Sequence, residues 1–157
     1  MLDETAPEGA LNYWKSSFVR ELSDELIDTL VERFPACPSP LGQILIEHFH
    51  GAVTRVDAAT TAVPHRRPGY NVVIPTQWLD PAATEANIAW TRETFEAITP
   101  HRADGRWLNY YDADEDAGAI DAAYGANRQR LAEIKRRYDP DNVFHHNQNI
   151  APAPVAG

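Results

Sequence analysis

The sequence predicts an α+β fold in which helices cover one face of an antiparallel sheet. Segments rich in branched apolar residues alternate irregularly with segments of helical periodicity. A sheet covered on one face is the simplest layered arrangement for that order of elements. The chain has 157 residues, 43% hydrophobic and 24% charged, which is the size and composition of one globular domain.

The first predicted helix spans residues 24–34, after a loose lead-in over residues 1–9. Ser23 is a favourable N-cap, and two acidic residues follow it in the first turn. Apolar residues recur on one helical face up to Phe34. The proline-rich stretch PACPSPLG then ends the helix.

Three short strands are predicted next. They are GQILIEHF, AVTRV and YNVVIP, the last ended by Pro75. Asp80 and Pro81 then favour a helix start, and periodicity extends that helix to about Ile98. RWLNYY is predicted as a further strand. A last helix is predicted over about 117–138, with basic residues in its final turn.

Charge and composition limit the partners. The net charge of −9 disfavours nucleic acid and anionic membranes, because phosphate binding needs a basic surface. No apolar run is long enough for a membrane span, and the polar N-terminus does not have the pattern of a signal peptide. A single cysteine, Cys37, favours a cytoplasmic location.

Several polar residues are candidates for chemistry. His48 and His50 share one face of a predicted strand and could bind a metal, but a third ligand is not evident. A hydrogen-bonded or solvated pair is the simpler interpretation. His65 and Arg66 could bind an anion, or could belong to an ordinary loop. Cys37 lies in a proline-rich turn without the surroundings of a nucleophile.

RWLNYYDAD is an unusual segment for a strand. Asn is disfavoured in a strand centre, and a buried Asn needs several hydrogen-bonding partners. In a regular strand, Asn109 and Tyr110 would point to opposite faces. Tyr110 and Tyr111 could serve as an acid or base if their pKa values were lowered, although ordinary packing is the simpler interpretation.

Taken in order, these motifs resemble the C-terminal region of the berberine-bridge-enzyme-like FAD-linked oxidases. WLNYYDAD is similar to the family pattern Tyr-x-Asn-Tyr-x-Asp, although Trp107 stands where the family often has tyrosine. The similarity continues in YGANRQRLAEIK, YDPDNVF and NQNI. Earlier parts agree, in NYWKSSF, HGAVTRV and TTAVPHR. Some plant members of the family use a glutamate as the base, and this chain has Arg55 near the position of that glutamate.

The resemblance implies FAD as cofactor, a small-molecule substrate and an FAD-binding domain supplied upstream or in trans. Residues 10–138 would form part of a substrate-binding domain, and 139–157 a tail that returns to the flavin. Asn109, Asn147 and Gln148 would contact the flavin, whose edge offers hydrogen-bond donors and acceptors. Tyr110 would be the general base. The alternative is a standalone binding module that kept the fold without flavin chemistry.

Overall fold

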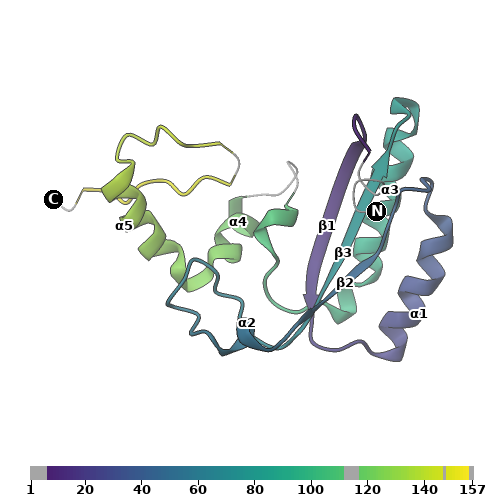
Figure 1. The fold of residues 1–157 in the computed structure, drawn as a ribbon, viewed down its shortest axis with the longest axis horizontal. Coiled ribbons are helices and arrows are strands. Elements are labelled where there is room, and N and C mark those ends of the chain that lie inside the picture. Colours follow the sequence, from purple (N-terminus) through teal and green to yellow (C-terminus); the bar gives the residue numbers. More distant parts are fainter. Residues whose placement is uncertain (1–6, 112–116, 147, 156–157) are drawn as a thin grey trace. The chain divides into compact units, whose positions relative to one another are not determined.

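The computed structural model describes residues 7–111, 117–146 and 148–155. The chain divides into two compact units (Figure 1). Unit 1 comprises residues 1–49 and 68–112, and unit 2 comprises residues 50–67 and 113–157.

Unit 1 is built on a three-stranded antiparallel sheet with the order β1-β3-β2 (Figure 1). The strands are β1 (Leu11–Val19), β2 (Leu45–Phe49) and β3 (Gly69–Trp78). β3 is central, and β2 forms an edge. The α+β fold with an antiparallel sheet is therefore confirmed.

Helices α1 (Asp24–Arg33) and α3 (Thr84–Ala97) lie on one face of this sheet (Figure 1). Side chains from all these elements form the core of unit 1. Its members are Val19, Leu26, Leu30, Val72, Ile74, Trp90, Phe95 and Ile98. Because strand side chains alternate between faces, the odd-numbered residues of β1 and the even-numbered residues of β3 point toward the helices.

Both predicted helices of unit 1 are confirmed, with their starts. The Ser23 side chain accepts a hydrogen bond from the Leu26 N–H at the start of α1. Asp80 accepts one from the Ala82 N–H, at a short 3₁₀ turn η3 (Pro81–Ala83) that leads into α3. At both starts, a side chain accepts a hydrogen bond from an N–H group that has no partner within the helix.

The strand predictions need four corrections, three of which concern residues 11–78. Strand β1 was not expected, because Lys15, Ser16 and Ser17 interrupt its apolar pattern. β3 continues through Pro75 to Trp78. The Pro75 carbonyl points to the β2 side, where it accepts a hydrogen bond from the Gln43 N–H. The pairing of β2 with β3 begins only at Leu45, so the N–H that proline lacks removes no hydrogen bond between these two strands.

Residues 52–56 were the third error. They form the short helix α2 (Ala52–Arg55) in unit 2 instead of a strand. Gly51 precedes it with a φ of 72°, and Thr54 donates its hydroxyl to the Gly51 carbonyl. This local turn favours a helix here, although the β-branched residues of the segment favour a strand.

The predicted helix over 117–138 is interrupted in unit 2. It consists of α4 (Ala117–Tyr124), a 3₁₀ turn η6 (Gly125–Asn127) and α5 (Arg128–Tyr138). Gly125 has a φ of 50°, which a regular helix does not allow. The Asn127 amide donates to the Ala58 and Thr61 carbonyls, 2.7 and 3.0 Å away, and so ties the turn to residues 58–61.

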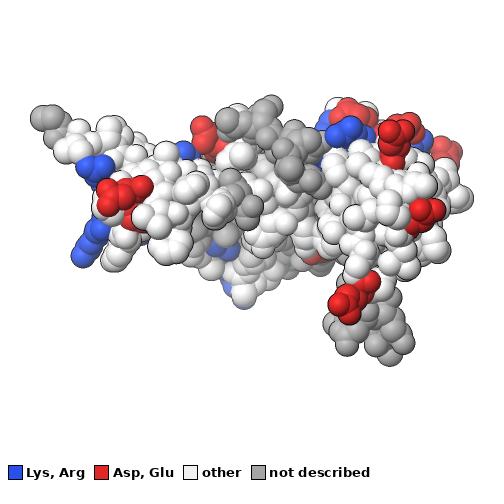
Figure 2. Space-filling view, turned by 90° about the horizontal axis from the view of Figure 1, so that it is seen from above, with Lys and Arg blue, Asp and Glu red and all other residues white. Residues whose placement is uncertain are grey.

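Within the described residues, no helix is long and apolar enough to cross a membrane. On the face shown in Figure 2, lysine and arginine side chains are separated from one another and do not form a continuous patch. This distribution agrees with the net charge of −9.

Candidate functional site

The sheet of unit 1 has a second face, opposite α1 and α3, that carries aromatic and polar side chains. β1 contributes Trp14 and Phe18 to it, and β2 contributes Glu47 and Phe49. Asn71 on β3 lies between these strands, since it pairs with Phe18 on one side and Glu47 on the other. We call this surface, together with Trp107 and Tyr110, the aromatic face.

The predicted strand over 106–111 is wrong. Residues Leu108–Tyr110 form a 3₁₀ turn, η5, in which the Tyr110 N–H donates to the Trp107 carbonyl. Successive side chains in a 3₁₀ helix diverge by about a third of a turn rather than by half a turn. The opposite orientation of Asn109 and Tyr110 that a strand would impose therefore does not arise.

Turn η5 packs against the aromatic face through its two flanking rings. Trp107 meets Phe49 edge-on, with ring centroids 5.6 Å apart, and also contacts Phe18 at 6.4 Å. Tyr110 stacks on Trp14, with centroids 5.8 Å apart and planes 19° apart. Contacts of this kind stabilise aromatic pairs by about 0.5–1.5 kcal/mol beyond their burial.

A chain of hydrogen bonds anchors the Tyr110 phenol. The phenol donates to Glu47 Oε1 at 2.7 Å, and Asn71 Nδ2 donates to Glu47 Oε2 at 2.7 Å. Partial burial, followed by the hydrogen bond to Glu47 and its charge, raises the pKa of Tyr110 to about 12. The phenol is therefore neutral at physiological pH.

Two buried polar atoms on this face have no hydrogen-bond partner among the described residues. They are Asn71 Oδ1 and Ser16 Oγ, and each residue is only 1% exposed. Buried polar groups normally have partners. The aromatic face thus has the directional polar groups and flat rings that suit a planar heteroaromatic ligand.

The predicted flavin contacts are distributed as follows. Asn109 is exposed in η5, directly before Tyr110. Gln148 belongs to unit 2, where its backbone carbonyl accepts from the Tyr124 hydroxyl at 3.2 Å. Asn147 lies outside the described residues.

Two of the candidate histidines, His48 and His65, contact neighbouring groups of the protein. His48 stacks on Tyr70, with ring centroids 4.9 Å apart. His65 Nε2 lies 3.0 Å from the Ala123 carbonyl, and burial lowers the pKa of the imidazole. Among the described residues, no three His, Cys, Asp or Glu side chains are grouped so as to hold a metal ion.

Arg66 and Cys37 also have local roles. Arg66 donates to the Val53 carbonyl at 3.1 Å and to the Thr61 hydroxyl at 2.6 Å, so its guanidinium holds a loop of unit 2 together. Burial raises the pKa of the Cys37 thiol, which donates to the Ser39 carbonyl. A thiol in that state is a poor nucleophile.

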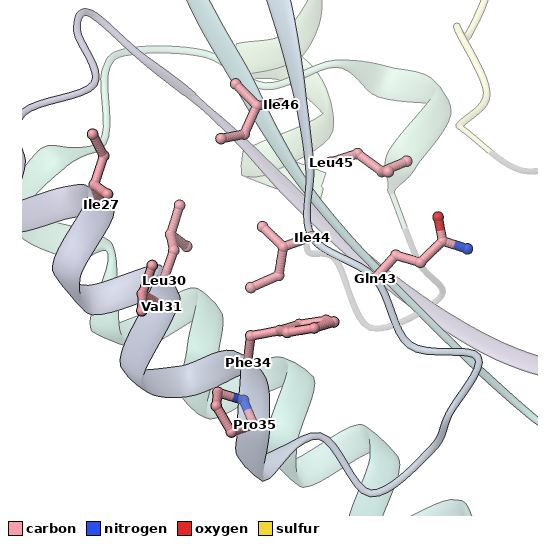
Figure 3. Close-up of a pocket in the computed structure, with 9 residues that line it drawn as sticks. All are labelled: Ile27, Leu30, Val31, Phe34, Pro35, Gln43, Ile44, Leu45 and Ile46. Carbon is pink, nitrogen blue, oxygen red and sulfur yellow. The ribbon is translucent and has the colours of Figure 1, made fainter.

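An apolar groove lies elsewhere in unit 1, between α1 and the segment leading into β2 (Figure 3). Its volume is about 580 Å³. Its lining is apolar except for Gln43, and consists of Ile27, Leu30, Val31, Phe34, Pro35, Gln43, Ile44, Leu45 and Ile46. This lining offers few polar groups that could take part in a reaction.

Glu47 and Asn71 were missed as functional candidates. Glu47 points to the opposite face of β2 from His48. The available signal was a charged residue and an amide, each next to branched apolar residues of a predicted strand. Such residues are disfavoured there unless they have partners.

Comparisons with known proteins place these features in a family. The family model described as "Berberine and berberine like" matches residues 106–151, a range that includes η5 and the C-terminal motifs. This chain is a relative of the berberine bridge enzymes. The family resemblance predicted from the sequence is thereby confirmed.

Full-length relatives and a solved structure agree. Berberine bridge enzyme-like 6 of Arabidopsis thaliana is 33% identical over 123 residues, which cover 68% of this chain and 22% of that protein. An FAD-linked oxidoreductase of Dictyostelium discoideum is 26% identical over 158 residues, which cover 97% and 33%. A glycopeptide hexose oxidase in complex with teicoplanin is 28% identical, with a TM-score of 0.78 over 92% of this chain and 33% of that one.

The chain therefore spans about a fifth to a third of the length of these berberine-bridge-enzyme relatives. The relatives are FAD-linked oxidoreductases.

Proposed function

We propose that this chain is the substrate-domain part of an FAD-dependent oxidase, and that its aromatic face meets the flavin and the substrate. The observation that carries the proposal is the placement of Tyr110. Its phenol lies against Trp14, is hydrogen-bonded to Glu47, and occupies the second tyrosine position of the family pattern. The oxidase similarity supports the same assignment.

The residues proposed to hold the isoalloxazine ring are Asn109, Asn147 and Gln148. Asn109 supports this role because its exposed amide precedes Tyr110 in the same turn. FAD, when bound, supplies the acceptor for a hydride from the substrate carbon and passes the electrons on to oxygen. The residues of the chain bind and orient the reactants, and Tyr110 accepts the proton of a substrate hydroxyl.

The proposed substrate is a small molecule with a secondary or hemiacetal hydroxyl. The similarity to a hexose oxidase favours a sugar hydroxyl. The aromatic rings of the face suit a sugar, because C–H faces of sugars pack on flat apolar surfaces while their hydroxyls need hydrogen-bonding partners. The phosphates of FAD would be bound by an FAD-binding domain, upstream or in trans.

Within this proposal, residues 10–138 supply part of the substrate domain and 139–157 supply the tail that returns to the flavin. A second candidate function is a non-catalytic binding module. The apolar groove beside α1 favours it, since that groove is built from side chains that do not belong to the aromatic face.

Flavin retention tests the proposal. The purified chain is mixed with FAD, desalted, and examined in the flavin absorption band, at roughly 350–500 nm. We expect a retained band that Asn109→Ala weakens, while Gln129→Ala, which removes an amide on α5, leaves it unchanged. Complete loss of flavin from the wild-type chain, or equal retention by Asn109→Ala, would count against the aromatic face as the flavin site.

A further inference from the structure

Strand β2 is an edge of the sheet that carries exposed apolar side chains. Among the described residues it pairs with β3 alone, and its first four residues, Leu45 to His48, are exposed. Soluble proteins usually protect such an edge with lysine, proline, a bulge or a covering segment. β2 has the sequence LIEHF, without lysine or proline, and its register with β3 is regular. An edge of this kind favours pairing with another strand.

The backbone N–H and C=O groups of Ile46 point away from β3. In an antiparallel ladder, successive residues direct these groups alternately toward one neighbour and toward the other. The Gln43 N–H donates to the Pro75 carbonyl on β3, which sets the phase of this alternation along the segment. Ile46 lies three residues later, so its backbone groups face the outer side of β2.

Helix α1 continues the same edge with apolar side chains above the sheet. Ile27, Val31 and Phe34 are 41%, 64% and 48% exposed. They line the groove together with Ile44 and Ile46, whose side chains point toward α1 (Figure 3). This edge of unit 1 therefore combines an open strand with an apolar groove of about 580 Å³.

We infer that the groove and the outer side of β2 form a self-association surface, and that its occupant is a second copy of this chain. A twofold axis perpendicular to the sheet places two β2 strands side by side and antiparallel, which is the orientation that the sheet already uses. The same axis brings the two α1 helices onto one face of the joined sheet. There, Val31 of each copy projects toward the groove of the other.

A second copy satisfies both parts of this edge at once. An apolar small molecule could fill the groove, but it would leave the outward N–H and C=O groups of Ile46 without a protein partner. A single extended peptide could pair with β2, but it would not supply side chains at the height of α1. A second copy brings a strand and a helix in the required relative position.

The size of the surface predicts a weak dimer. Nine residues line the groove, whereas a specific interface of standard size uses about 20–30 residues and about 800 Å² on each side. An interface of roughly half that size is typical of transient association. We therefore expect a dissociation constant on the order of 10 μM.

The charges beside the groove predict how salt acts on the dimer. Asp24, Asp28 and Glu32 are exposed on α1, whereas Arg33 turns toward α3 and pairs with Glu93. Two copies therefore bring acidic side chains close together at the rim of the contact. Because salt screens repulsion between exposed charges, association should strengthen as the salt concentration rises. A basic partner would instead bind more weakly in high salt.

Sedimentation velocity of the full chain, at about 1 to 200 μM, tests the inference. We expect a reversible monomer–dimer equilibrium that tightens several-fold between about 0.05 and 0.5 M NaCl. Val31→Glu should weaken it by at least about tenfold, because it places a carboxylate in the apolar contact next to an acidic rim. A wild-type chain that stays monomeric at the highest concentration, or that associates less in high salt, would overturn the inference.

Val143→Glu is the matched control, because Val143 in unit 2 is 64% exposed, as Val31 is. It should leave the equilibrium unchanged. Ile46→Pro tests the strand contact, since it removes the outward N–H and should weaken association, while Ile46→Val should not. If Ile46→Pro does not fold, Val31→Glu still decides, because glutamate suits an exposed helical position. Equal dissociation constants in wild type and Val31→Glu would refute the contact.

Two further readouts locate the interface without any flavin, so they do not depend on the proposed oxidase function. Hydrogen exchange of the Ile46 amide should slow as the protein concentration rises through the dissociation constant, because that N–H gains a partner. An apolar dye occupies the same groove and should therefore shift the equilibrium toward the monomer. An Ile46 amide whose exchange does not depend on concentration, or a dimer that saturating dye leaves unchanged, would contradict the assignment.

Discussion

The ring of Tyr110 lies nearly parallel to the indole of Trp14, with centroids 5.8 Å apart. This contact attaches turn η5 to strand β1 and brings a residue from the family-matched segment onto the sheet. The stack also excludes water from one side of the phenol, and desolvation is the largest cause of the raised Tyr110 pKa.

Removing this stack should loosen η5 from the sheet. We expect Trp14→Ala to lower the free energy of unfolding by about 2 kcal/mol, through lost burial and the lost aromatic contact. The Tyr110 pKa should fall toward 10 in the same variant, because the phenol becomes more hydrated. Urea denaturation and the tyrosine titration measure the two effects. Tyr138→Ala, which removes a ring that is 73% exposed, should change stability by less than about 0.5 kcal/mol.

A hydrogen bond between two buried threonines, Thr76 and Thr91, links the sheet to α3, and the two substitutions to valine should differ in their cost. The Thr91 hydroxyl donates to the Asn87 carbonyl at 2.9 Å, so the Thr76 hydroxyl donates to Thr91. Thr91→Val leaves the Thr76 donor buried without an acceptor and should cost about 1–3 kcal/mol. Thr76→Val removes only the donor and should cost less.

The double variant Thr76→Val/Thr91→Val completes a thermodynamic cycle. Its stability should exceed that of Thr91→Val alone, because no unpaired hydroxyl remains. Additive losses in urea denaturation would show that the two hydroxyls do not form the hydrogen bond described.

His65 makes unit 2 sensitive to mild acid. Burial lowers the imidazole pKa below its ordinary value of 6.5, so the unfolded chain binds a proton at a pH where the folded chain does not. The resulting stability is complete above about pH 6.5 and is lost as the pH falls through the lowered pKa. Unfolding free energies measured between pH 7.5 and pH 5 should fall in the wild type and fall less in His65→Gln.

His145→Gln is the control for that experiment, because His145 is exposed in the same unit. It should keep the wild-type pH dependence. Asp139, whose pKa is lowered chiefly by its hydrogen bond from Lys135, loses its contribution only below its ordinary value of 3.8 and so does not overlap with this window. An identical slope in His65→Gln and wild type would show that another group is responsible.

The apolar groove should bind hydrophobic dyes. Val31 and Phe34 line it and are 64% and 48% exposed. Val31→Lys should reduce the fluorescence of an apolar probe such as anilinonaphthalene sulfonate, while changing stability by less than about 0.5 kcal/mol. Equal dye fluorescence in both proteins would mean that the dye binds elsewhere.

Local signals explain which elements the sequence could predict. Ser23 and Asp80 are strong helix-start residues. As expected, α1 begins next to Ser23, and η3, the turn that leads into α3, begins next to Asp80. YNVVIP is dense in β-branched residues and lies within β3, and the LIEHF part of GQILIEHF forms β2. In these segments, propensity and tertiary packing agree.

The errors occur where a single turn or a distant contact decides the backbone. Gly51, with its positive φ, precedes the short helix α2, and Gly125, with its positive φ, interrupts the last helix. In the sequence alone, these two glycines look the same as glycines that end strands. η5 is held by Trp14, Phe18 and Phe49, which are remote in sequence. Tyr110 and Asn109 could be selected by resemblance, but the pairing of Tyr110 with Glu47 depends on sheet register.

The four indole N–H groups of the chain provide the most direct test of the aromatic face as the flavin site. Trp14 and Trp107 lie on that face, whereas the Trp78 indole donates to Thr84 and the Trp90 indole donates to the Arg33 carbonyl. Nitrogen–proton correlation spectra recorded during FAD addition report all four. The account predicts that the Trp14 and Trp107 signals shift with FAD concentration while those of Trp78 and Trp90 stay in place. Shifts confined to Trp78 and Trp90, or no shift at saturating FAD, would contradict it.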